Sequence, residues 1–158
     1  MWNALVAEFS DLADVQEATR LVVRLVAAAL MGAVIGYDRE RNASPAGLRT
    51  HILVALGAAL FVVVGQHAGF DRPEMSRVVQ GLVAGIGFLG AGAILKRDDT
   101  MSVRGLTTAA SIWLTAAIGI AAGMGQLVTA LVAAVMGVIV LGVLTRADRK
   151  IRGERDED

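Results

Sequence analysis

Two short clusters of charged and hydroxyl-bearing residues are the parts of this sequence best suited to binding chemistry. They consist of Asp38, Arg39, Glu40, Arg49 and Thr50 in the first cluster, and Arg104, Thr107 and Thr108 in the second. In each cluster the threonines follow a Gly-Leu pair that opens an apolar segment, so we expect them in the first turn of a helix. Free backbone amides and the positive end of the helix dipole favour an anion there. The clusters predict a site for a phosphate group, an anionic lipid headgroup or a protein partner.

Other kinds of site chemistry have little support in the sequence. It contains no nucleophile–base pattern, no P-loop and no metal-ligand cluster, and with zero Cys it can form neither disulfides nor zinc–thiolate sites. Asp38 and Glu40 are flanked by arginines, which makes them a poor Mg²⁺ site, and nothing places His51 near His67. We therefore expect no catalytic residue, no metal site and no cofactor, and the sequence does not suggest nucleic-acid binding.

The segments that carry these clusters are apolar enough to lie in a membrane. The 158 residues are 55% hydrophobic and 19% charged, with a mean hydropathy of +0.60, whereas soluble domains average about 45–50% apolar and about 25% charged residues. In the segment 127–144 only Thr129 is polar. A helix there would be apolar on every side and, at about 1.5 Å per residue, about long enough to cross a bilayer core.

Five such segments predict an all-α, polytopic membrane protein. The expected spans cover residues 21–36, 48–65, 78–95, 106–123 and 127–144, and Arg24 is expected near the end of the first one. An amphipathic surface helix is expected over residues 1–17, before the membrane domain at 18–145, and a charged tail at 146–158. No carboxylate lies deep in any span, which argues against a dedicated cation pathway.

The basic residues predict how the spans are oriented. Most of them flank one side: Arg39, Arg41, Arg49, Lys96, Arg97, Arg104, Arg146, Arg149, Lys150, Arg152 and Arg155. By the positive-inside rule that side is cytoplasmic, so the N-terminus lies outside and the C-terminus inside a bacterial inner membrane. The arginines of the two clusters thus have a second interpretation, in which they only set this topology and pair with Asp38, Glu40, Asp98 and Asp99.

An internal repeat relates the first four spans. Residues 30–60 match residues 88–118 at a constant offset of 58, with identities that include Arg39/Arg97, Ser44/Ser102, Gly47/Gly105, Leu48/Leu106 and Thr50/Thr108. Such a match predicts two parallel helical hairpins, spans one and two and spans three and four, with a ligand or partner site at their interface.

Glycines recur at four-residue spacing along the spans. They are Gly32 and Gly36, Gly81 and Gly85, and Gly119 and Gly123, with Gly90 and Gly92 further along the third span. In a bilayer, close backbone approach at small residues drives helix association, so we expect these faces to pack against other helices, within the chain or in a homo-oligomer. A second interpretation is that the segment 85–92 is flexible or broken and lines a site.

Three stretches of the sequence resemble the MgtC/SapB family of bacterial inner-membrane proteins. They are Pro45-Ala-Gly-Leu-Arg-Thr-His51, the segment 85–95 with its four glycines, and Val103-Arg-Gly-Leu-Thr-Thr-Ala-Ala-Ser-Ile-Trp113. In addition, Gly36-Tyr-Asp-Arg-Glu40 is similar to the family's Gly-x-x-Arg-Glu motif. The resemblance favours the short, SapB-like form without the C-terminal soluble domain, because that domain is absent and Leu114 stands where virulence-associated members commonly have Cys.

The resemblance implies a role in magnesium limitation and ion homeostasis. Members look like modulators that bind other membrane proteins, notably the ATP synthase, rather than magnesium pumps. We therefore expect a regulatory membrane protein that contacts the ATP synthase or a larger transporter. The alternative is a small ion transporter or channel whose path lies between the repeated hairpins.

Overall fold

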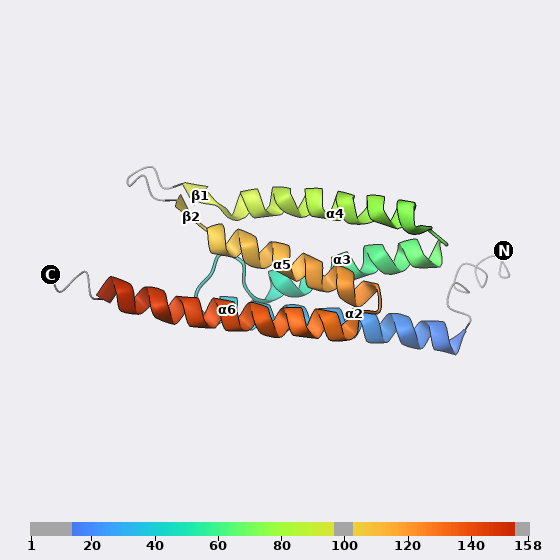
Figure 1. The fold of residues 1–158 in the computed structure, drawn as a ribbon, viewed down its shortest axis with the longest axis horizontal. Helices are drawn as coiled ribbons and strands as arrows, with labels where there is room; N and C mark the ends of the chain where they lie inside the picture. The colour runs from blue at the N-terminus through green and yellow to red at the C-terminus, as the bar shows by residue number, and fades with distance from the viewer. Residues whose placement is uncertain (1–13, 97–102, 154–158) are drawn as a thin grey trace, which may run out of the picture.

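The computed structural model describes residues 14–96 and 103–153, which form five α-helices and one short strand pair. The helices are α2 (Val15–Arg41), α3 (Leu48–His67), α4 (Arg72–Ala93), α5 (Leu106–Gly123) and α6 (Leu127–Gly153), and strand β1 (Leu95–Lys96) pairs antiparallel with β2 (Val103–Arg104). All five helices run along one axis of the molecule, and α2 begins at the end opposite to that where α6 ends (Figure 1). The all-α architecture with five helices, predicted from the sequence, is confirmed.

Three of the five predicted spans begin at the first residue of a helix, namely Leu48, Leu106 and Leu127. Helices α2 to α5 are long and apolar enough to cross a membrane, whereas the apolar part of α6 within the described residues, Leu127–Val143, is shorter. Of the surface helix expected over 1–17, residues 1–13 lie outside the described part of the chain, and Val15 already begins α2. Helix α6 continues into the expected tail as far as Gly153.

Turn chemistry explains where the helices begin. The Asp14 side chain caps α2 by accepting a hydrogen bond from the Gln16 amide at 2.9 Å. At the start of α4, Asp71 and Glu74 form a reciprocal capping box, with Pro73 in the first turn. Gly105, which precedes α5, has a φ of 94°, and a Cβ atom there would overlap the Ala93 carbonyl oxygen. Only glycine fits that position without displacing the end of α4.

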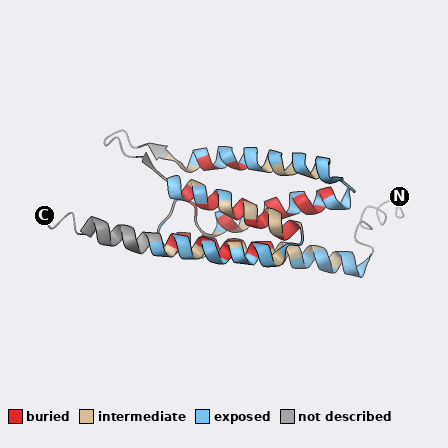
Figure 2. Ribbon diagram, viewed as in Figure 1, coloured by how far each residue is buried: buried red, intermediate tan, exposed pale blue. Residues whose placement is uncertain are grey.

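Helix α5 is the centre of the bundle, and α4 lies at its edge. Helix α5 contacts α2, α3, α4 and α6, whereas α4 packs mainly on α5 and touches α3 only slightly. In the most apolar segment of α5, 50% is buried, compared with 11% of the most apolar segment of α4. Figure 2 shows the same contrast, with buried residues gathered on the central helices and α4 mostly exposed.

The core is built from small side chains. Ala28, Ala55, Ala59 and Ala122 are fully buried between α2, α3 and α5, and Ile35 and Ile118 are the large residues among them. Between lipid-facing helices there is no water to expel, so association depends on van der Waals contact and on how closely the backbones approach. Alanine and glycine provide that approach here.

The glycines singled out in the sequence fall into two groups. Gly32, Gly36, Gly90, Gly119 and Gly123 are buried against other helices, whereas Gly81, Gly85 and Gly92 are exposed, with nothing within 4 Å of a Cβ atom built on them. Within one chain, therefore, the Gly81/Gly85 face of α4 has no helix packed on it. Helix α4 also runs unbroken through residues 85–92, since it ends only at Ala93, so the alternative interpretation of that segment as a broken helix is wrong.

Candidate functional site

The predicted binding residues gather at one end of the bundle. Asp38, Arg39 and Glu40 end α2, Arg49 and Thr50 begin α3, and Thr107 and Thr108 begin α5. We call this the Ser44 end, after the loop 42–47 that joins α2 to α3, and the opposite end, with loops 68–71 and 124–126, the Gln66 end. Arg104 is placed by its backbone in β2, and its side chain lies outside what the structure describes. Arg97, Asp98 and Asp99 also lie outside the described residues.

Arg39 is a buried cation that is paired inside the chain. Its Nε donates to Asp38 Oδ2 at 3.0 Å and its Nη2 contacts the same oxygen, while only 7% of the Arg39 side chain is exposed, against 20% for Asp38. Asp38 Oδ1 also accepts a hydrogen bond from Asn42 Nδ2 at 3.3 Å. A buried charge needs such a partner, because burial without one is strongly unfavourable. The first role of Arg39 is therefore to pair with Asp38 inside the bundle.

Glu40 occupies the N-terminus of α3. Its Oε2 accepts a hydrogen bond from the Leu48 amide at 2.9 Å, where the N-cap residue, Gly47, has no side chain to do so. A carboxylate of the chain thus neutralises one of the free amides that made this helix end attractive for an anion. Arg49 and Thr50 remain exposed beside it and line a shallow pocket with Glu40.

His51 and Ser111 form a buried polar contact between α3 and α5. His51 is 0% and Ser111 2% exposed, and His51 Nε2 lies 3.1 Å from Ser111 Oγ. The other ring nitrogen, Nδ1, lies 2.8 Å from the Gly47 carbonyl oxygen, which can only accept. A neutral His51 therefore carries its proton on Nδ1, and its unprotonated Nε2 is an acceptor that faces the Ser111 hydroxyl. That hydroxyl also lies 2.8 Å from the Thr108 carbonyl oxygen, so its single proton serves one of two acceptors.

The Ser44 loop is attached to α5 next to this contact. Ser44 Oγ lies 3.0 Å from Thr108 Oγ1, and Thr108 is only 4% exposed. Its neighbour Thr107 is exposed. Of the two α5 threonines predicted to bind an anion, Thr108 is therefore engaged within the chain and Thr107 is exposed.

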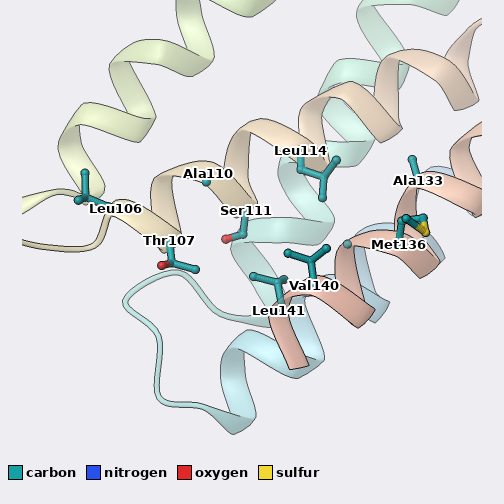
Figure 3. A pocket seen from close by; sticks show the side chains of 10 residues that line it. Leu106, Thr107, Ala110, Ser111, Leu114, Ala133, Met136, Val140 and Leu141 are labelled. Atoms are coloured by element: carbon teal, nitrogen blue, oxygen red, sulfur yellow. The ribbon is translucent and has the colours of Figure 1, made fainter. Parts of the chain in front are cut away.

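Thr107 borders an apolar groove of about 550 Å³ between α5 and α6. Figure 3 shows side chains from both helices bordering this groove, with the hydroxyls of Thr107 and Ser111 on the α5 side. Its other lining residues include Leu106, Leu114, Met136 and Val140. These two hydroxyls are the polar groups of the groove lining, which carries no charged residue.

At the Gln66 end, Arg24 joins three helices. Its Nη1 donates to Gln66 Oε1 at 2.6 Å and to the Gly123 carbonyl oxygen at 3.0 Å, in the last turns of α3 and α5. The expectation that Arg24 lies near the end of its span is confirmed. The sequence pattern gave no sign of its two partners, because Gln66 and Gly123 are 42 and 99 residues away.

In the sequence His51 is an isolated histidine, and its contact with Ser111 was not predicted. The spacing Gly47 to His51 already indicated a side-chain bond to the carbonyl four residues earlier, at a helix N-terminus. Ser111 bonds across helices to His51, whereas Thr115 donates to the Ser111 carbonyl of its own helix. In residues 14–96 and 103–153, no three His, Asp or Glu residues lie close enough to hold a metal ion.

Comparison with known proteins shows the family of this chain. A family model described as "MgtC family" matches residues 25–150. The protein SrpB of Synechococcus elongatus is 52% identical over 116 residues, with 66% of this chain and 64% of SrpB covered. The protein MgtC of Salmonella typhimurium is 45% identical over 115 residues, with 73% of this chain and 48% of MgtC covered.

A third relative is the Escherichia coli K12 protein named "Putative magnesium transporter YhiD". It is 41% identical over 132 residues, with 77% of this chain and 59% of YhiD covered. The chain thus spans about half to two thirds of the length of these relatives. No solved structure matches it. The family resemblance seen in the sequence is confirmed, and the chain belongs to the MgtC family of multi-pass membrane proteins.

Proposed function

We propose that this protein is a regulatory membrane protein that adjusts ion homeostasis under magnesium limitation by binding a larger membrane protein, such as the ATP synthase or a transporter. The observation that carries the proposal is the outward face of α4. Part of this face is a stripe of small or polar residues that are all exposed, which we call the outward stripe: Ser76, Gln80, Ala84, Gly87 and Ala91. Their spacing of three to four residues places them along one line of the helix, beside the exposed Phe88.

Gln80 distinguishes this stripe from an ordinary lipid-facing surface. It lies eight residues into α4, about 12 Å from the start of the helix, and its amide is exposed. An amide at that depth in a bilayer gains free energy by bonding to another helix, and small neighbours let the two backbones approach closely. Gly87, with nothing within 4 Å of a Cβ atom, leaves room for such an approach.

The experiment is growth at limiting Mg²⁺ of a strain that lacks its own copy of the gene and carries this protein or a variant. Ala84→Leu places bulk on the outward stripe, and Val128→Leu, which adds one carbon atom at a 76% exposed position of α6, is the control for leucine on a different exposed helix. We expect Ala84→Leu to abolish growth and Val128→Leu to leave it unchanged, at equal protein levels by immunoblot. Full growth with Ala84→Leu would contradict the outward stripe of α4 as the partner surface.

The partner itself is tested by co-reconstitution. Purified ATP synthase in liposomes pumps protons when ATP is added, and we expect addition of this protein to change the pumping rate. The Ala84→Leu variant should leave the rate as it is without the protein. An unchanged rate with the unaltered protein would remove the ATP synthase as partner.

We propose further that the protein is not an enzyme. His51 and Ser111 have the side chains of a base and a nucleophile, but both are buried and bonded to neighbouring backbone. A substrate would have no access to His51, which is 0% exposed and so could not act as the base. The exposed Arg49, Thr50 and Thr107 at the Ser44 end support binding of an anionic headgroup, a phosphate or a partner instead. Arg49→Ala should abolish binding of inorganic phosphate or anionic lipid, and unchanged binding would leave Arg49 with a role in topology alone.

The alternative function is a small ion transporter, which the name of the YhiD relative favours. The path would lie between two repeated hairpins, α2–α3 and α4–α5. One contact supports the repeat: Gly32 packs against His51, and at the offset of 58 Gly90 packs against Ala109. Mg²⁺ flux into liposomes that contain only this protein tests the alternative. Flux above that of empty liposomes would favour it, and its absence would favour the regulator.

The proposed location is a bacterial inner membrane with the N-terminus outside. The opposite positions of the start of α2 and the end of α6 support an odd number of spans (Figure 1). Because the sequence has zero Cys, single cysteines report topology cleanly. A cysteine replacing Ala43, at the Ser44 end, should be shielded from an impermeant thiol reagent in intact spheroplasts, and one replacing Ala68, at the Gln66 end, should react. The reverse pattern would invert the orientation.

A further inference from the structure

An apolar groove of about 590 Å³ lies between α3 and α4, beside the outward stripe. Its walls are Phe61 of α3 and Val78, Leu82, Ile86 and Leu89 of α4. Gly81 and Gly85 form its floor, and nothing lies within 4 Å of a Cβ atom built on either. Any larger residue at these two positions would fill the hollow. The groove therefore exists because α4 has glycine there and packs only slightly on α3.

Arg77 is the charged residue that lines this groove. Among the described residues the one ion pair joins Arg39 to Asp38, so Arg77 has no acidic partner there. The carboxylate nearest in sequence, Glu74, accepts the Asp71 amide in the capping box at 2.9 Å. The guanidinium therefore remains available to an anion, and its planar fork suits the paired oxygens of a phosphate.

The length of the groove matches one leaflet of a bilayer. Arg77 and Leu89 are twelve residues apart in α4, which corresponds to about 18 Å along the helix axis. The hydrocarbon of one leaflet is about 15 Å thick, half of the core. Arg77 lies near the Gln66 end of the helix, where its long side chain reaches the headgroup level. An acyl chain that starts at Arg77 would thus end near Leu89.

The two other apolar grooves lack this combination. The α5–α6 groove presents the hydroxyls of Thr107 and Ser111 and has no charged lining residue. The groove between α2 and α6 has Asp38 and Arg41 in its lining, so it carries both signs of charge. Of these three grooves, only the α3–α4 groove is lined by a single cation with no acidic partner among the described residues.

We propose that the α3–α4 groove binds one anionic phospholipid, with its phosphate on Arg77 and one acyl chain on the Gly81–Gly85 floor against Phe61. The lipid completes the loosely packed edge of the bundle by filling the space that α4 leaves beside α3. This site is separate from the Ser44 end, because Arg77 is near the opposite end of the molecule. It does not depend on which membrane protein is the partner.

The test is native mass spectrometry of the purified chain in detergent with equal amounts of phosphatidylglycerol and phosphatidylcholine. We expect the protein to retain one phosphatidylglycerol in preference to phosphatidylcholine. Arg77→Gln should reduce that preference roughly tenfold, since charge-assisted hydrogen bonds to phosphate are lost. Arg72→Gln removes a charge from the same helix outside the groove lining and should leave the preference unchanged.

A second variant tests the apolar part of the α3–α4 groove independently of the Arg77 charge. Gly85→Leu places a side chain on the floor, where its Cβ atom meets no protein atom within 4 Å, so we expect the bundle to keep its stability. We expect this variant to lose both lipids to a similar extent. If Gly85→Leu retained both lipids, the acyl chain would not lie in the groove. If the unaltered protein retained the two lipids equally, the site would have no preference for an anionic headgroup.

Other occupants would give other results in the same experiment. Displacement of the lipid by soluble glycerol phosphate would place the site on Arg77 alone and overturn the role of the groove. A lipid-free dimer that Gly85→Leu converts to monomer would show that a second copy of the chain, rather than a lipid, fills the groove. Each of these two outcomes contradicts the proposal.

Discussion

Helices α2 and α4 carry the same pair of glycines in opposite surroundings. In α2, a Cβ atom on Gly32 would lie 2.7 Å from the His51 carbonyl oxygen, and one on Gly36 would lie 2.8 Å from Leu48 Cα. In α4, Gly81 and Gly85 have the same spacing, yet nothing lies within 4 Å of either position. One pair brings two backbones into contact, and the other leaves a groove open.

The difference lies in what else holds each helix. The α2 side has Arg24 joined to α3 and α5, the Ser44 loop joined to Thr108, and the His51–Ser111 contact beside it. Helix α4 rests mainly on α5. Glycine spacing therefore permits close packing, while specific polar contacts decide where it occurs. The loosely held helix is the one that offers surface for other molecules.

The largest effect is expected from adding a side chain to the closed pair. Gly32→Leu should lower the free energy of unfolding by more than about 3 kcal/mol, because the new atoms meet backbone rather than a movable side chain. The measurement is denaturant unfolding in mixed micelles. Gly81→Leu is the matched change in α4 and should cost less than about 1 kcal/mol. Equal losses in the two variants would erase the distinction between the helices.

Removal of the buried histidine should have the next largest effect. His51→Ala deletes a fully buried ring together with its bonds to Gly47 and Ser111, at a cost of about 2–4 kcal/mol. His67→Ala, at an exposed position, should change stability by less than about 0.5 kcal/mol. The same unfolding assay compares the two, and a His51→Ala protein as stable as the unaltered one would show that this contact does not hold α3 on α5.

Arg24→Gln should have a smaller effect, because Arg24 is only partly buried. The shorter amide cannot reach both the Gln66 side chain and the Gly123 carbonyl, and we expect a loss of about 1–2 kcal/mol. Arg20→Gln, one turn earlier and exposed, is the control. Amide hydrogen exchange should rise at the ends of α3 and α5 and stay unchanged in α4. A rise confined to α4 would contradict the assignment of Arg24 to the tightly packed side.

The smallest expected effect concerns the cap of α4. Asp71→Ala removes the acceptor for the Glu74 amide and should cost about 1 kcal/mol. Because α4 is held mainly by α5, exchange should increase in the first turns of α4 while α2, α3 and α5 keep their protection. Asp14→Ala makes the same change at the start of α2. If Asp71→Ala loosened the whole bundle instead, α4 would be a cooperative part of it.

Much of the fold was predictable because it depends on local sequence. The apolar runs and the Gly-Leu starts place the helices, and three helix starts match to the residue, whereas α4 begins at Arg72, six residues before the predicted span 78–95. The candidate site was predictable only in outline. The site residues lie at the expected end of the bundle. Charge and spacing did not predict all of their partners, which are Asp38 for Arg39, the Leu48 amide for Glu40, and Ser44 for Thr108.

By itself the sequence determined that lipid is the solvent of this chain, which segments are helical and which family it belongs to, because hydropathy and motif are properties of neighbouring residues. Only the tertiary structure decided that His51 meets Ser111, 60 residues away, that Arg24 meets Gly123, and that one glycine pair is closed while the other is open. Those outcomes depend on which helices lie side by side. In an apolar solvent many pairings are similar in hydrophobic energy, so a few polar contacts and close backbone approaches select among them.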